Sequence, residues 1–458
     1  MHSYKQLTIN KKSELLFGNA PYPLTTRRGL IIGGGQVYPE LNFTVPPMAI
    51  NDSSFSEILK IYKNIISEAC QRAVELECEG FVAEFETLPE MTQNPMYAIE
   101  LTKIMNEVMD EYHEKCGLKS ALRITPNDLR EMERPQRMRS GPLLEKMLET
   151  FEGCAEAGGE MLSIESTGGK EIHDDALLSC DITQVIFALA VLGVRDMKFL
   201  WGKIVDITAR TGTTAGGDTA CGFGNTAMVL AERRNIPKVF AAVVRAITAV
   251  RSLVAYEMGA TGPGKDCGYE NVFLKAITGF PMSMEGKTAA CAHLSPLGNI
   301  AAATCDLWSN ESVQNIKLLG GMAPTVYFEQ LSYDCRLMNV ALRENQGDVL
   351  QKLFVQSDAY LDPQALILTP ENAIRISTRL VESSDYYEAA KEVALCAIDI
   401  IREGMANQSI KIIDREIPYL DMMRDTILTL PDSEQTFIDI MLPTMDHSKI
   451  LLPEYGIE

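Results

Sequence analysis

Hydrophobic positions along the chain switch repeatedly between two periods. Apolar residues recur at helical spacing between Ile58 and Ala69, and a short apolar run follows at residues 81–85. The first pattern predicts an amphipathic helix and the second a buried strand. The same pairing returns twice, with proline at the start of each helix and glycine at its end. These helices run from Asn94-Pro95 to Gly117 and from Gly141-Pro142 to Gly158-Gly159, and strands follow at residues 121–124 and 161–164.

The alternation continues through the middle of the chain. A helix is predicted for residues 181–193, strands for residues 197–201, 253–256 and 281–284, and a short extended piece that ends at residues 218–221. Strands that alternate with helices form a parallel sheet, so the fold class is α/β. This many units in a row favour a closed TIM (β/α)8 barrel over an open sheet. No Gly-x-Gly-x-x-Gly run follows the first strand, which weighs against a dinucleotide-binding fold.

The last quarter of the chain has a different pattern. Residues 386–404 predict a helix, and Asp432 with Gln435 resembles a capping box before another apolar stretch. We therefore predict an N-terminal segment at residues 1–50, a barrel at residues 51–380, and a helical C-terminal extension at residues 381–458.

Composition and charge narrow the function. The chain has 458 residues, of which 46% are hydrophobic and 23% charged, as is ordinary for a globular protein. Its 42 Lys and Arg against 62 Asp and Glu give a formal charge of −20, which makes nucleic acid and anionic membranes poor partners. No run approaches the ~20 apolar residues of a membrane span, and residues 1–18 do not resemble a signal peptide. We expect a cytoplasmic protein, and the eleven Cys and 22 Met suit an anaerobe.

Three residues of metal-ligating types fall at predicted strand ends. Glu165 follows the strand at residues 161–164, Cys221 ends the extended piece, and Cys267 lies in a glycine-rich loop after residues 253–256. Working residues of a barrel gather where its strands end, so these three are candidate ligands. Their spacing alone is no zinc signature, because neither a Cys-x-x-Cys nor a His-x-x-x-His pair is present. A buried structural thiol stays the alternative for each cysteine.

Five other residues are candidates for chemistry. His293 is a candidate ligand or acid, with a hydrogen-bonded structural histidine as the alternative. Glu84 and Glu86, at another strand end, are either acids or members of salt bridges at the barrel rim. Lys265 and Asp266 are interpreted as a loop ion pair, and their loop lacks the Lys-Ser/Thr ending of a phosphate-binding P-loop.

Several long runs carry a resemblance to a known family. They include Ser163-Ile164-Glu165-Ser166-Thr167-Gly168-Gly169-Lys170-Glu171, Gly217-Asp218-Thr219-Ala220-Cys221, Arg251-Ser252-Leu253-Val254-Ala255-Tyr256-Glu257, Gly262-Pro263-Gly264-Lys265-Asp266-Cys267-Gly268-Tyr269-Glu270-Asn271 and Met284-Glu285-Gly286-Lys287-Thr288. In these runs the chain resembles the methanol:corrinoid methyltransferase family, the MtaB subunit. The resemblance covers nearly the whole chain, and the run around Cys267 is long and specific.

The resemblance implies a TIM barrel with a zinc site of one glutamate and two cysteines, which fall on Glu165, Cys221 and Cys267. It implies that zinc polarises the oxygen of methanol at an open fourth position, and that Co(I) of a corrinoid takes the methyl group. The chain lacks the Asp-x-His-x-x-Gly motif that ligates cobalt, so we expect the corrinoid on a separate protein. That protein would dock over the barrel mouth on the N-terminal segment and the C-terminal helices, with this chain as a homodimer or in a hetero-oligomer.

The resemblance leaves the proton and the methyl donor open. A proton must reach the departing oxygen, and Asp218, Tyr256, Glu257 and Glu84 are unranked candidates to donate it. Methanol as donor suits methanogenesis or acetogenesis. One alternative is the same chemistry with a methoxylated aromatic compound or a methylamine. The other is a non-catalytic subunit that only docks the corrinoid protein.

Overall fold

A computed structural model of the chain describes residues 3–45, 48–312 and 317–458. Its centre is a parallel sheet of seven strands in the order β7-β6-β5-β4-β3-β9-β8. Strands that follow one another in the chain therefore lie side by side, as in a barrel. They are β3 (Tyr38–Phe43), β4 (Gly80–Glu86), β5 (Lys119–Thr125), β6 (Met161–Ile164), β7 (Thr214–Asp218), β8 (Ser283–Glu285) and β9 (Leu307–Ser312).

An irregular segment, residues 261–266, closes the ring between β7 and β8. The backbone N–H of Thr261 donates to the carbonyl of Ala215 in β7 at 2.9 Å. On the other side, the N–H of Glu285 in β8 donates to the carbonyl of Asp266 at 2.9 Å. The closing segment thus stands where a sixth strand would lie, so the predicted α/β barrel is confirmed with seven regular strands in place of eight.

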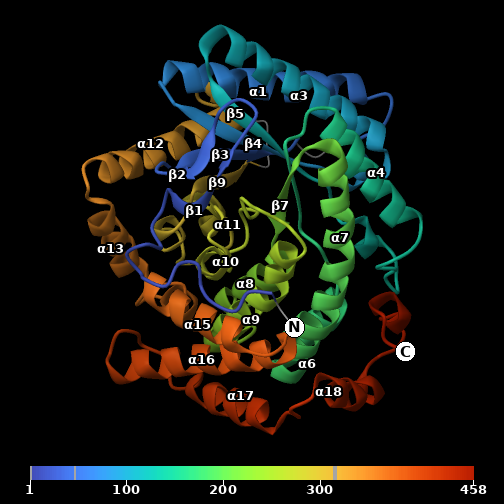
Figure 1. Cartoon of the computed structure of the whole chain (residues 1–458), viewed down its shortest axis with the longest axis vertical. Helices are drawn as coiled ribbons and strands as arrows, with labels where there is room; N and C mark the ends of the chain where they lie inside the picture. The colour runs from blue at the N-terminus through green and yellow to red at the C-terminus, as the bar shows by residue number, and fades with distance from the viewer. Residues whose placement is uncertain (1–2, 46–47, 313–316) are drawn as a thin grey trace.

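Helices surround this ring (Figure 1). The helices and strands predicted in the first third of the chain are present as α1, α3 and α4 and as β4, β5 and β6. In α1 the residues at helical spacing, among them Ile58 and Ile65, form its buried face. Gly117 ends α3 in the left-handed conformation, with φ of 69°. The main surrounding helices are α1 (Phe55–Glu75), α3 (Pro95–Cys116), α4 (Pro142–Glu156), α7 (Val194–Thr211), α9 (Lys238–Glu257), α10 (Asn271–Thr278) and α12 (Ala323–Arg343).

The N-terminal segment closes one end of the barrel. Strands β1 (Asn19–Thr25) and β2 (Ile31–Gly34) form an antiparallel hairpin. Its residues Leu30 and Ile32 pack in one buried cluster with Val82 and Leu307, which belong to barrel strands. This is the end where the strands begin, opposite the mouth that carries strand-end residues. The barrel itself starts with β3, before the predicted residue 51. The sequence did not indicate this strand, because polar residues of β3 face the interior and interrupt its hydrophobic pattern.

Two predicted strands are wrong, because residues 197–201 and 253–256 are helical. Residues 197–201 belong to α7, which continues without a break from α6 (Ile182–Ile186) and a π-helical stretch, η2 (Phe187–Gly193). Gly193 does not end a helix but lets Arg251 approach, since a Cβ there would lie 3.1 Å from the Cδ of Arg251. The expected turn is therefore absent.

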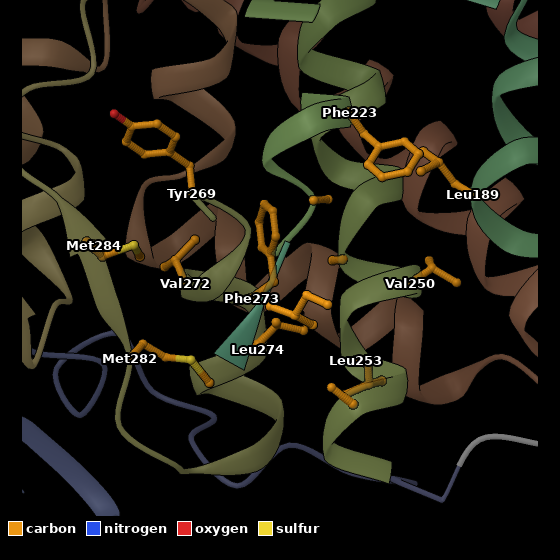
Figure 2. Packing of buried hydrophobic residues seen from close by; sticks show 14 of the residues in the cluster. Leu189, Phe223, Val250, Leu253, Tyr269, Val272, Phe273, Leu274, Met282 and Met284 are labelled. Carbon is orange, nitrogen blue, oxygen red and sulfur yellow. The ribbon is translucent and has the colours of Figure 1, made fainter. Parts of the chain in front are cut away.

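Helix α9 hides its period because it is buried on all sides. Every residue from 239 to 256 is buried, so no polar face marks a helical repeat. Figure 2 shows Val250 and Leu253 of α9 within a cluster of buried hydrophobic residues. Among the described residues, α9 is the helix that is long and apolar enough to span a membrane, and that stretch is wholly buried in the protein.

The C-terminal helices form an outer layer that returns to the barrel mouth. Helix α16 (Tyr386–Ala406) packs against α9 and α15 (Pro370–Glu382), and α17 (Ile417–Thr429) and α18 (Glu434–Met441) follow. Ser433, not Asp432, caps α18, because its side chain accepts the N–H of Thr436. The last residues reach the loop after β6, where the hydroxyl of Tyr455 accepts the N–H of Gly169 at 3.0 Å.

The hairpin predicts a contrast between two adjacent isoleucines. Ile32 is fully buried and Ile31 is 44% exposed. We expect Ile32→Ala to lower the free energy of unfolding by about 3 kcal/mol, because it opens a cavity under the barrel. The control Ile31→Ala is expected to change it by less than about 0.5 kcal/mol. Chemical unfolding curves of the two variants give the comparison, and equal effects would contradict the role of the hairpin.

Candidate metal centre

The three predicted metal ligands meet at the mouth of the barrel. Glu165 directly follows β6, Cys221 begins a short π-helical turn after β7, and Cys267 follows the closing segment. One ligand atom from each lies within 4.8 Å of the other two. The buried thiol of Cys267 donates a hydrogen bond to Oε1 of Glu165 at 2.7 Å, while Glu165 and Cys221 are half-buried.

The donor atoms of this centre fit a zinc ion. Two sulfur atoms and one carboxylate oxygen are ligand types that zinc takes in proteins, and three protein ligands leave one position open. Burial raises the pKa of Cys267 well above its usual value, and Cys221 and Glu165 raise it further. Crowding three such groups in a buried place is costly unless a cation shares it.

Asp128 supports the loop that follows Glu165. Its carboxylate accepts the backbone N–H of Thr167 at 2.9 Å and the Thr167 hydroxyl at 3.0 Å. Arg130 donates to the same carboxylate at 2.8 Å. Burial opposes the charge on Asp128, but Arg130 and Thr167 outweigh it and hold the pKa of Asp128 below its usual value. The loop is therefore tied to a buried ion pair.

Asp218, one of the predicted proton donors, supports the same loop from the other side. Its carboxylate accepts the hydroxyl of Ser166 at 2.6 Å and the indole N–H of Trp201 at 2.8 Å. It also accepts the backbone N–H of Thr219 at 2.8 Å, and the guanidinium of Arg251 lies 3.5 Å away. With its oxygens bound in this way, Asp218 holds the loop rather than facing the ligands.

Asn225 joins the two cysteine segments. Its side-chain N–H group lies 3.5 Å from Sγ of Cys221 and donates to the carbonyl of Cys267 at 2.9 Å. Its side-chain oxygen accepts from Arg245 at 2.7 Å. Sequence reasoning gave Asn225 no role. Its position one helical turn after Cys221 was the available signal.

Lys265 is the buried centre of charge next to the ligands. Its Nζ lies 2.7 Å from Asp266, 3.0 Å from Glu165, 3.3 Å from Glu84 and 3.6 Å from Sγ of Cys267. Burial disfavours the ammonium, but Asp266, Cys267, Glu84 and Glu86 outweigh it and raise the pKa of Lys265 well above its usual value. Lys265 and Asp266 do form the predicted ion pair. It lies inside the barrel, where it fixes Glu165, rather than on a surface loop.

Glu84 and Glu86 lie near Lys265 at the end of β4. Glu84 accepts the hydroxyl of Thr125 at 2.7 Å, and Glu86 lies 3.5 Å from Lys265. Burial, and then Asp266, raise the pKa of Glu84 well above its usual value, and Lys265 offsets only part of this. Of the two predicted roles, the structure shows ion pairing, and it places these pairs within the barrel.

Tyr256 and Glu257, the other predicted proton donors, are bound to the fold. The buried hydroxyl of Tyr256 donates to Sδ of Met282 at 3.3 Å, and burial raises its pKa. Glu257 accepts the N–H of Ser3 at 2.5 Å and the hydroxyl of Tyr386. Both therefore serve contacts between barrel, N-terminal segment and C-terminal helices. Their neighbouring hydrophobic run had suggested a strand end, which the helix α9 overturns.

His293, Glu285 and Tyr269 form a second polar group at the mouth. Glu285, the last residue of β8, is fully buried, and Nδ1 of His293 lies 3.5 Å from its Oε2. Tyr269 is buried, and Figure 2 shows it close to Val272 and Phe273. The guanidinium of Arg245 lies over its ring at 5.3 Å. Sequence reasoning singled out His293 but missed Glu285, which a glutamate at a strand end could have indicated.

The chain is similar to one family of proteins over its whole length. Residues 1–455 match the model of the methanol-cobalamin methyltransferase B subunit, MtaB. A methanol–corrinoid protein co-methyltransferase from Methanosarcina barkeri (strain Fusaro / DSM 804) is 39% identical over 459 residues, 99% of each chain. A chain of the methanol:cobalamin methyltransferase complex MtaBC from Methanosarcina barkeri has a TM-score of 0.96 and 38% identity, over 100% of both chains. Sequence and fold therefore agree along the whole length.

The buried ion pair that supports the Glu165 loop predicts that the effect of Asp128→Asn on the free energy of unfolding depends on pH. Because its pKa is lowered on folding, Asp128 stabilises the protein above the usual Asp pKa of about 3.9, and this is lost as pH falls through the folded-state value. We expect Asp128→Asn to lower the free energy of unfolding by about 3 kcal/mol at neutral pH, since it breaks a buried ion pair. Unfolding measured between about pH 5 and pH 3 should show this difference shrinking.

The control for this change is Asp446→Asn. Asp446 also has a lowered pKa, but it is exposed and accepts only from Ser448. Its substitution is expected to leave the unfolding curve close to that of the unaltered protein. A cost for Asp128→Asn that does not vary with pH would contradict the ion-pair argument.

Proposed function

Because the chain belongs to the methanol-cobalamin methyltransferase B subunit family, it transfers the methyl group of methanol to a corrinoid protein, and we propose that it does so at a zinc ion held by Glu165, Cys221 and Cys267. The observation that carries the zinc proposal is the convergence of these three ligand atoms within 4.8 Å at the barrel mouth. Their chemistry fits the metal, and the fourth position is left for the substrate.

The chain prepares this centre mainly by fixing its ligands. When bound, zinc supplies Lewis acidity that weakens the bond between the oxygen and the methyl carbon of methanol. Lys265 orients Glu165 from 3.0 Å, and Asn225 fixes the segments of both cysteines. Such support holds the ligands in one geometry before substrate arrives.

None of the predicted proton donors is well placed to reach the substrate. Asp218 and Tyr256 are bound within the fold. Glu84 is separated from Glu165 by Lys265, which lies 3.3 Å from Glu84 and 3.0 Å from Glu165. We therefore assign Glu84 the role of holding Lys265 rather than that of donating a proton.

The two alternative functions are less well supported. The family and its relative are named for methanol, which disfavours a methoxylated aromatic compound or a methylamine as the methyl donor. A subunit that only docks the corrinoid protein would not need a complete set of ligands fixed by a buried ion network.

The corrinoid protein should dock over the barrel mouth, because its cofactor must reach the open position. The C-terminal tail lies at this face, where Tyr455 contacts the loop after Glu165. The N-terminal hairpin lies at the opposite end, so we place the dock on the C-terminal helices and tail, and the rest of the N-terminal segment stays a predicted contributor. A cytoplasmic location, an anaerobic source, a role in methanogenesis or acetogenesis, and a homodimer or hetero-oligomer stay proposals from the sequence.

Metal analysis of cysteine variants tests the zinc proposal. We expect about one zinc per chain, and Cys267→Ala or Cys221→Ala to weaken binding by at least about 100-fold, because each removes a ligand. Cys305→Ala is the matched control, since Cys305 is also buried but contacts the carbonyl of Ala302 instead. Full zinc content in Cys267→Ala would show that the ligands are assigned wrongly.

An assay of methyl transfer tests the substrate. The zinc-loaded protein is mixed with a Co(I) corrinoid protein and methanol, and methyl-Co(III) formation is followed by absorbance. We expect turnover with methanol and none with a methylamine or a methoxylated aromatic compound. Reaction with one of those donors but not with methanol would favour the alternative.

A further inference from the structure

We propose that His293, held by Glu285, donates the proton that turns the oxygen leaving methanol into water. The inference rests on the proposed function, because it concerns the same reaction at the same barrel mouth. It adds the proton donor, a role that the predicted candidates do not fill.

Glu285 stands beside the segment that carries a metal ligand. It is the last residue of β8, and its N–H donates to the carbonyl of Asp266, the residue before Cys267, at 2.9 Å. Its carboxylate is fully buried, and among the described residues neither oxygen has a hydrogen-bond partner. A buried carboxylate without a partner is costly, so it favours a cation close by. The cation nearest at hand is His293, at 3.5 Å.

His293 connects this carboxylate with water. It caps the C-terminal end of α11 (Lys287–Ala292), and its side chain keeps 22% of its exposure. Nδ1 of the ring faces Glu285, and the remaining exposure of the side chain is to solvent. A proton donor must be protonated again by solvent after each turnover, so it needs a position in contact with water.

The charges around His293 favour its protonated form. The contact with Glu285 raises its pKa most, burial and Arg245 oppose this, and Glu165 raises it again. The net result is a pKa above the usual value for a histidine.

The other described histidines do not combine these properties. His173 is fully buried against Phe223, with ring centres 5.0 Å apart. His113 contacts the carbonyl of Leu118, next to the start of β5 and so at the end of the barrel opposite the mouth. His447 is exposed on the C-terminal tail.

The proposed step balances in atoms and electrons. The bond between carbon and oxygen of methanol breaks, and its electron pair stays on the oxygen. Co(I) of the partner's corrinoid supplies the pair for the new bond to carbon and becomes methyl-Co(III). The oxygen, leaving as hydroxide, takes the proton of the imidazolium and becomes water. Neutral His293 then takes a proton from solvent.

A comparison of His293→Gln with His113→Gln tests this role. Zinc-loaded proteins react once with methanol and Co(I) corrinoid protein between about pH 6 and pH 9. The unaltered protein and His113→Gln should lose rate as pH rises through the pKa of His293. We expect His293→Gln to be about 100-fold slower and to lack this pH dependence, because a general acid is missing. Added imidazole should restore part of its rate, and its zinc content should be normal.

A second measurement does not depend on turnover. The imidazole resonance of His293, assigned by its absence in His293→Gln, is titrated by NMR. We expect a pKa above the usual ~6.5 in the unaltered protein and a lower pKa in Glu285→Gln, since the negative partner is lost. The pH at which the rate of Glu285→Gln falls should be lower than in the unaltered protein by the same amount as the pKa of His293.

The outcomes separate this inference from the proposed function. A His293→Gln protein with full zinc and an unchanged pH profile overturns the role of His293. An unchanged titration of His293 in Glu285→Gln overturns the role of Glu285. Absence of zinc, or of methyl transfer, in the unaltered protein instead contradicts the proposed function.

Discussion

A buried ammonium group holds the working end of this barrel together. Lys265 pairs with Glu84 from β4, with Glu165 from the end of β6, and with Asp266 from the closing segment. Leaving one partner of a buried ion pair without the other costs several kcal/mol, so these three elements keep their relative positions. The candidate metal centre therefore takes its geometry in large part from the ion network beneath it.

The two ends of the barrel have opposite chemistry. At one end the N-terminal hairpin covers the strands with apolar residues such as Leu30 and Ile32. At the other end polar groups such as Glu165 and Lys265 converge around Cys267. This division leaves one face for substrate and for the corrinoid protein. It agrees with membership of a family whose reaction transfers a methyl group from a small alcohol to a large cofactor carried by a partner.

The sequence predicts the barrel, because helices such as α3 and α4 have clear caps and amphipathic patterns. It fails at α9, since a helix buried on all sides shows no period, and at Gly193, where the glycine serves close packing instead of a turn. The convergence of Glu165, Cys221 and Cys267 could be predicted from strand ends and family motifs. Asn225, one helical turn after Cys221, and Glu285, at a strand end, had signals in the sequence, but their contacts depend on segments that only the fold brings together. Asp218 and Tyr256 look like acids in a sequence but are bound within the protein.

The N-terminal hairpin also sets the order in which the chain can fold during synthesis. Leu30 and Ile32 pack against Leu307, which the ribosome adds much later. The hairpin, which emerges early, can pack against Val82 first, but its buried cluster is complete only when β9 exists. Contacts so distant in sequence slow folding and expose surfaces that aggregate. The hairpin that closes one end of the finished barrel therefore leaves the growing chain in need of protection from aggregation during synthesis.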